Sequence, residues 1–128
     1  MSDWNTDGGG HQVTYAGTAS GEATIANGKA ISGAVDVRQF RHVSFVVKGA
    51  WTAGSMAFKA ADTATAATFW PVYAKDNTLP RVPTKAGTLY ATNDIVGEQH
   101  FIKFWAEDGS AGTVAQGAER TIKYYLKS

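Results

Sequence analysis

A chain of 128 residues with a formal net charge of +1 has the size of one domain and can bury a core without cross-links. The balanced charge excludes a basic field for nucleic acid or an anionic membrane, and the absence of cysteine excludes disulfides and thiolate metal sites. No apolar run approaches membrane-spanning length, and the start lacks the pattern of a signal peptide. We therefore expect no nucleic-acid partner and no membrane partner.

The first residues, MSDWNTDGGGHQ, form a glycine-rich stretch that we interpret as an extended N-terminal arm over residues 1–12, followed by one folded domain over residues 13–128. Trp4 in this arm is a candidate contact with a neighbouring subunit. The arm also matches the first six positions of a calcium loop, but Thr14 stands where that loop needs its closing glutamate. No metal site is predicted there.

Alternation of apolar and polar residues dominates the rest of the chain and predicts antiparallel strands with one buried face. The pattern runs through AVDVR at 34–38, HVSFVVK at 42–48, SMAFKA at 55–60 and RTIKYYLK at 120–127. No window has the sustained apolar spacing of a helix. The predicted fold class is all-β, a single antiparallel β-sandwich or jelly-roll-like domain with the N-terminal arm.

Turn sequences separate these strands. Asn27 and Gly28 predict a hairpin, because this pair tolerates two positive φ angles. EDGSAG at 107–112 predicts another turn, in which two carboxylates precede a glycine. LPRVPTKAG at 79–87 contains two prolines and predicts an irregular loop or a sheet edge.

Two segments are apolar on both faces: TFWPVY at 68–73 and HFIKFWAE at 100–107. Strands of this kind are covered on both sides. One face belongs to the core, and we assign four residues to it: Trp70, Val72, Ile102 and Phe104. The second cover is the arm, the proline-rich loop, a partner chain or a ligand.

The opposite faces carry the candidate binding residues. A protein interface is the preferred interpretation, because Trp and Tyr anchor interfaces. Its candidate residues are Trp4, Phe69, Tyr73, Phe101, Trp105 and Tyr125. A sugar platform is the second interpretation and requires coplanar exposed rings in a shallow groove, drawn from Trp51, Trp70 or Trp105. Packing of these rings under a loop of the same chain is a third interpretation, which the sequence supports as well as either of the other two.

Catalytic motifs are absent from the sequence, which has no nucleophile elbow, no P-loop and no His-Glu-x-x-His. The carboxylates at Glu107 and Asp108 fit a turn better than an acid–base pair. We expect a protein that is not an enzyme and that has no catalytic residue, no cofactor and no metal ion.

One long stretch carries a resemblance to a known group of proteins. The segment ISGAVDVRQFRHVSFVVKGAWTAGSMAFKAADTATAATFWPVY, residues 31–73, together with GTVAQGAERTIKYYL near the end, resembles small structural proteins of tailed bacteriophages. Its elements are a Ser-Gly-x-Val-Asp strand, a Val-rich strand followed by Trp51, a strand at Phe58, and FWPVY. The resemblance covers about half of the chain.

The resemblance implies a β-sandwich component of the virion, made in the cytoplasm of the host bacterium. Of the roles known for such proteins, a capsid decoration protein fits the small single domain and its arm best. Its expected partners are the major capsid protein or other virion subunits, bound as a homo-oligomer or lattice. The alternative is a carbohydrate-binding β-sandwich module, for example a head-fibre or tail adhesion domain.

Overall fold

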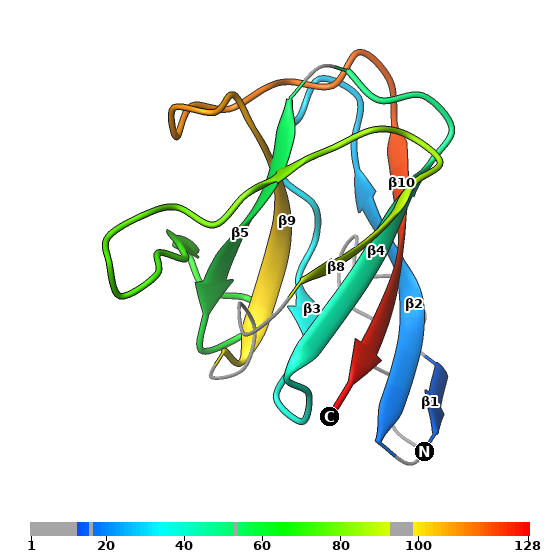
Figure 1. Cartoon of the computed structure of the whole chain (residues 1–128), viewed down its shortest axis with the longest axis vertical. Coiled ribbons are helices and arrows are strands. Elements are labelled where there is room, and N and C mark those ends of the chain that lie inside the picture. The colour runs from blue at the N-terminus through cyan, green and yellow to red at the C-terminus, as the bar shows by residue number, and fades with distance from the viewer. Residues whose placement is uncertain (1–12, 16, 53, 93–98) are drawn as a thin grey trace.

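A computed structural model of the chain describes residues 13–15, 17–52, 54–92 and 99–128. These residues form ten β-strands and no helix. The strands build two antiparallel sheets that face each other as a sandwich (Figure 1). The predicted all-β antiparallel sandwich is therefore confirmed. The arm at residues 1–12, with Trp4 and the partial calcium loop, lies outside the described residues.

The first sheet has the order β1-β2-β10-β4-β8, and the second has the order β3-β9-β5-β6. The strands of the first sheet are β1 (Val13–Tyr15), β2 (Thr18–Ile25), β10 (Arg120–Lys127), β4 (His42–Lys48) and β8 (Leu89–Thr92). Those of the second are β3 (Val35–Asp36), β9 (Phe101–Glu107), β5 (Ser55–Ala61) and β6 (Trp70–Pro71). A further short strand, β7 (Val82–Pro83), pairs with β5 on the same edge as β6.

The core lies between the two sheets and follows the predicted alternation. Val43, Phe45 and Val47 of β4 are all buried, and so are the inward residues of β10 and β5. Five rings meet at the centre: Phe45, Phe58, Tyr90, Phe104 and Tyr124. The closest ring centroids are 5.4 Å apart, and each such pair adds about 0.5–1.5 kcal/mol beyond the area that it buries.

The turn at Asn27 and Gly28 corrects one prediction, because it does not join two paired strands. β2 leads through this turn to β3, which pairs with β9 in the other sheet. Gly28 has a positive φ of 79°, whereas Asn27 does not, and the tight hairpin turn predicted needs both. The Gly28 N–H instead donates to the Gln116 carbonyl at 2.8 Å, which directs the chain across the sandwich.

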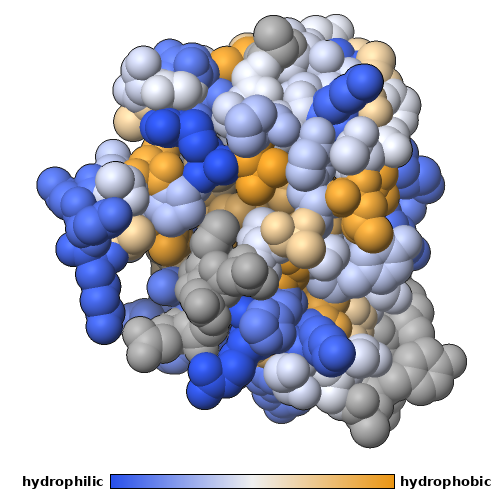
Figure 2. All heavy atoms as spheres, in the orientation of Figure 1, coloured by the Kyte–Doolittle hydropathy of each residue, from blue (hydrophilic) through white to orange (hydrophobic). Residues whose placement is uncertain are grey.

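The side of the sandwich between β5 and β8 faces the viewer in Figures 1 and 2. The segment between β7 and β8 crosses this side in Figure 1. Figure 2 shows apolar residues gathered toward the middle of this face, with hydrophilic residues around them. The second sheet and the segments beside it carry most of the predicted binding residues.

Candidate binding surfaces

Trp105 lies on the outer face of the second sheet and is buried by its own chain. Its side chain is 1% exposed and packs with Ala57, Leu79 and Ile31. The Lys59 ammonium lies 4.7 Å from the centroid of the indole ring. The proline-rich segment that begins at Leu79 is therefore the second cover of β9, as one of the four sequence interpretations expected. We no longer count Trp105 among the candidate interface residues.

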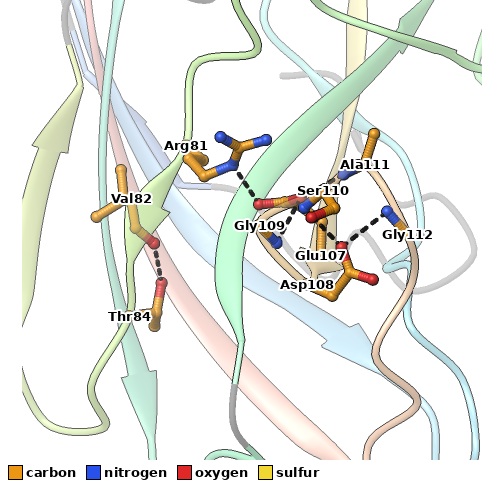
Figure 3. A network of polar contacts seen from close by, with 9 residues as sticks. All are labelled: Arg81, Val82, Thr84, Glu107, Asp108, Gly109, Ser110, Ala111 and Gly112. Atoms are coloured by element: carbon orange, nitrogen blue, oxygen red, sulfur yellow. Dashed lines mark hydrogen bonds and ion pairs between the residues drawn. The ribbon is translucent and has the colours of Figure 1, made fainter.

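The Trp105 cover, as we call residues 79–83, is held in place by a buried ion pair (Figure 3). The Glu107 side chain is 0% exposed, and its Oε1 accepts a hydrogen bond from the Arg81 Nε at 2.6 Å. Its Oε2 accepts from the backbone N–H groups of Gly109 at 2.8 Å and Ala111 at 3.0 Å. The sequence predicted this turn but gave no sign that Glu107 is buried.

Asp108 closes the same turn from the solvent side. Its Oδ1 accepts hydrogen bonds from the N–H groups of Ser110 at 2.7 Å and Gly112 at 3.0 Å (Figure 3). These two backbone donors lower the pKa of Asp108 below its ordinary value of 3.8. Both oxygens of Glu107 and the Oδ1 of Asp108 accept hydrogen bonds from their own chain, so this pair organises the turn that the sequence predicted.

Phe69 and Phe101 are half-buried, and a cation of the same chain lies against each ring. The Lys103 ammonium is 4.4 Å from the centroid of Phe69, and the Arg38 guanidinium is 5.0 Å from that of Phe101. Hydrogen bonds from Arg38 to the buried Asp36 carboxylate orient the guanidinium and raise the pKa of Arg38. Each ring therefore keeps only part of its area for a partner.

Tyr73 and Tyr125 are exposed, at 47% and 44%, and lie on different parts of the molecule. Tyr125 stands on the outer face of the first sheet, directly between Ser20 of β2 and Ser44 of β4. These small neighbours leave the ring open to a partner. Tyr73 follows β6 at the edge of the second sheet.

Trp70 was assigned to the core, and this assignment is wrong, because its side chain is 68% exposed. Trp70 pairs with Ala60, which faces the core, so the strand phase was right. The two-residue strand β6 lies at the edge of the second sheet. The ring of Trp70 therefore extends beyond the part of the first sheet that buries Ala60. Ile102 and Phe104 are buried as predicted, and Val72 is half-buried against the core.

Beside Trp70 and Tyr73 the surface is hollowed. The Trp70 hollow, as we call it, has a volume of about 520 Å³. Its lining combines two exposed rings with hydroxyl, amide and carboxylate groups. The lining residues are Ala60, Ala61, Asp62, Thr63, Ala66, Thr68, Trp70, Pro71, Val72, Tyr73 and Gln99.

The sugar platform predicted from the tryptophans takes a different form in the structure. Trp105 is buried, and Trp51 is half-buried against the core with its Nε1 donating to the Gly54 carbonyl at 3.3 Å. Of these three, only Trp70 is an exposed ring. Its neighbour in the hollow is Tyr73, which the sequence analysis had placed in the protein interface.

Within residues 13–15, 17–52, 54–92 and 99–128, no three His, Asp or Glu side chains are grouped so that they could hold a metal ion. In the same residues, no helix has the length and apolar character needed to cross a membrane.

Comparison with solved structures places the fold beside a phage-related protein. No protein-family model matches the sequence, and no curated protein matches it. The SPBc2 prophage-derived protein YomS has a similar structure, with a TM-score of 0.55 and 15% identity over 91% of this chain and 97% of YomS. Protein NMB1881 from Neisseria meningitidis is more distant, with a TM-score of 0.42 and 8% identity over 100% of this chain and 88% of the other. The match to YomS shows a shared fold.

Proposed function

We propose that this chain is a non-enzymatic structural protein of a phage virion, and that it decorates the capsid by binding other virion subunits. The observation that carries the proposal is the fold match to a prophage-derived protein over nearly the full length of both chains. The sequence pattern of residues 31–73 supports the same origin independently.

The outer face of the first sheet is the surface that best suits binding to the major capsid protein. Tyr125 lies near the end of the middle strand β10, in a shallow depression of about 410 Å³ whose lining includes Ser20, Ser44 and His42. An exposed tyrosine surrounded by small residues can enter a pocket of a partner and lose little conformational entropy. Lys48 and Glu22 neutralise each other in an exposed salt bridge of this sheet, at 2.9 Å, and the Lys123 ammonium lies 5.8 Å from the centroid of the Tyr125 ring.

The experiment that tests the virion role is mass spectrometry of gradient-purified particles, with copy numbers counted against the major capsid protein. We expect a copy number comparable to that of the capsid protein. A handful of copies would contradict decoration and move the protein to the neck or tail. Absence from the particles would overturn the virion role altogether.

The binding face is tested by adding purified protein to particles that lack it. We expect Tyr125→Ala to weaken binding by about tenfold or more, as for a central interface anchor. Tyr73→Ala is the matched comparison, because Tyr73 has a similar exposure but follows β6 at the edge of the second sheet. Equal binding by both variants and the parent protein would contradict the assignment of this face.

A further inference from the structure

We propose that the Trp70 hollow is a binding site for a neutral carbohydrate, with the indole of Trp70 stacked on a pyranose ring. The site does not depend on the virion role, since it uses the edge of the second sheet and leaves the Tyr125 face free. The inference rests on the position of two rings, the polar groups around them and the charge of the lining.

Backbone pairing with β5 holds the chain at Trp70 and at Val72. Trp70 pairs with Ala60 in the β5–β6 ladder, and the Val72 N–H donates to the Phe58 carbonyl at 3.0 Å. The side chain of Val72 packs against the core. The backbone that carries Trp70 is therefore ordered before a ligand binds, which reduces the ordering entropy that binding has to overcome.

A closed turn fixes the segment that follows Tyr73. The Ala74 N–H donates to the Thr78 carbonyl, and the Asn77 N–H donates to the Ala74 carbonyl, both at 2.9 Å. The Asp76 carboxylate accepts from the Thr78 N–H at 3.1 Å and from its hydroxyl at 2.6 Å. The second ring of the hollow is therefore attached to a defined loop rather than to a free one.

The remaining lining supplies what sugar hydroxyl groups need. Asp62 provides acceptors, Gln99 provides both donors and acceptors, and the hydroxyls of Thr63 and Thr68 can do either. The negative face of the Trp70 ring attracts the positively polarised C–H groups on one side of a pyranose. The volume of about 520 Å³ lies within the range of small-molecule sites, whereas protein interfaces have a more apolar centre.

The charge of the hollow selects against acidic ligands. Asp62 is the one charged residue among its described lining residues, which include no Lys and no Arg. Its side chain is 96% exposed and lies 3.7 Å from the Nδ1 of His100. A phosphate, a uronic acid or a sialic acid would meet this carboxylate, and the described lining offers no Lys or Arg to pair with the ligand's own negative charge. Neutral hexoses, 6-deoxyhexoses and N-acetylhexosamines fit the lining.

The test is a titration of the purified full chain with a panel of neutral oligosaccharides at millimolar concentration, followed through the indole N–H signals in NMR spectra. We expect at least one neutral glycan to shift the Trp70 signal, and we expect Trp70→Ala to weaken its binding by about tenfold or more. Leu89→Ala, which removes another exposed apolar side chain from the first sheet, should leave the affinity unchanged.

Four outcomes would overturn the proposal: no shift of the Trp70 signal with any neutral glycan, a glycan that binds Trp70→Ala normally, tighter binding of sialylated or uronate-containing glycans, or burial of Trp70 by another protein in the virion. Thermal unfolding of Trp70→Ala confirms that the variant is folded. The virion role is measured separately by copy number, so either proposal can fail without the other.

Discussion

Trp70 and Trp105 belong to the same sheet and show opposite outcomes. Trp70 lies on the face that points toward the core and is 68% exposed, whereas Trp105 lies on the outer face and is 1% exposed. In a sandwich, strand phase alone predicts the reverse. Burial of a ring therefore depends on which segment covers its face of the sheet. A side chain on an edge strand can extend past the opposite sheet and remain exposed.

The cover over Trp105 has three identifiable attachments. β7 pairs with β5 through Ser55 and Met56, Leu79 packs on the indole, and Arg81 is bound to the buried Glu107 carboxylate. Trp70, in contrast, borders the Trp70 hollow, and no described segment lies over its ring as residues 79–83 lie over Trp105. The attachments through Leu79 and Arg81 can each be removed by one substitution.

The largest expected effect comes from truncating Trp105, with the same change at Trp70 as its comparison. Trp105→Ala should lower the free energy of unfolding by about 3–5 kcal/mol, because it leaves a cavity under residues 79–83. Trp70→Ala should change it by about 0.5 kcal/mol or less, since most of the ring is already in water. Urea unfolding of both variants measures the comparison.

A milder substitution separates the volume of Trp105 from its polar group. The Trp105 Nε1 is buried and has no hydrogen-bond partner among the described residues. Trp105→Phe removes this unsatisfied donor together with part of the ring, so its cost should be well below that of Trp105→Ala. Similar costs for Trp105→Ala and Trp70→Ala would contradict the burial that distinguishes the two sites.

Removing Arg81 should have the next largest effect. Arg81→Ala leaves the Glu107 carboxylate buried without its cation, and we expect a loss of about 3 kcal/mol, at the lower end for a broken buried pair because Arg81 is partly exposed. Lys48→Ala breaks the exposed pair with Glu22 and should cost about 0.5 kcal/mol or less. If both variants lost the same stability, Arg81 would not be an anchor of the cover.

A leucine pair tests the cover directly. Leu79→Ala should cost about 2–3 kcal/mol and should increase the access of a soluble quencher to Trp105, because Leu79 is 7% exposed and packs on that ring. Leu89→Ala makes the same chemical change at a side chain that is 61% exposed, and it should leave both quantities almost unchanged. Unchanged quenching in Leu79→Ala would mean that another segment protects Trp105.

The sequence predicted the fold well in strands whose apolar and polar residues alternate and whose apolar face is buried by the opposite sheet. HVSFVVK and RTIKYYLK alternate cleanly, and β4 and β10 occupy those residues with their apolar faces in the core. Both strands lie inside the first sheet with neighbours on each side, so phase and burial agree. The all-β class and the central core follow from such segments.

The candidate site was predicted only in part, because its geometry depends on contacts between distant segments. Nothing in HFIKFWAE states that residues 79–83 return to cover Trp105, or that Arg81 meets Glu107 26 positions away. The double-sided apolar pattern did predict a second cover, and a lone arginine in a proline-rich loop was the available signal for its anchor. Trp70 was missed because alternation gives the face of a residue but not the length of the opposite sheet.

The smallest expected effect concerns Asp108, at the solvent side of the turn that contains Glu107. Its folded pKa is lowered by the N–H groups of Ser110 and Gly112, so its contribution to stability is present above 3.8 and is lost as the pH falls through the folded pKa. Asp108→Asn keeps an acceptor oxygen but cannot ionise. The stability difference between the parent protein and this variant should therefore shrink on acidification from neutral pH to below 3.8.

The same stability difference at both pH values would show that the N–H groups of Ser110 and Gly112 do not favour the ionised carboxylate of Asp108. The hydrogen bonds of the Asp108 carboxylate go to Ser110 and Gly112, and Arg81 of the Trp105 cover acts on it through its charge as the weakest of the causes that lower its pKa. The quenching of Trp105 should therefore stay almost unchanged in this variant, which separates the turn from the cover.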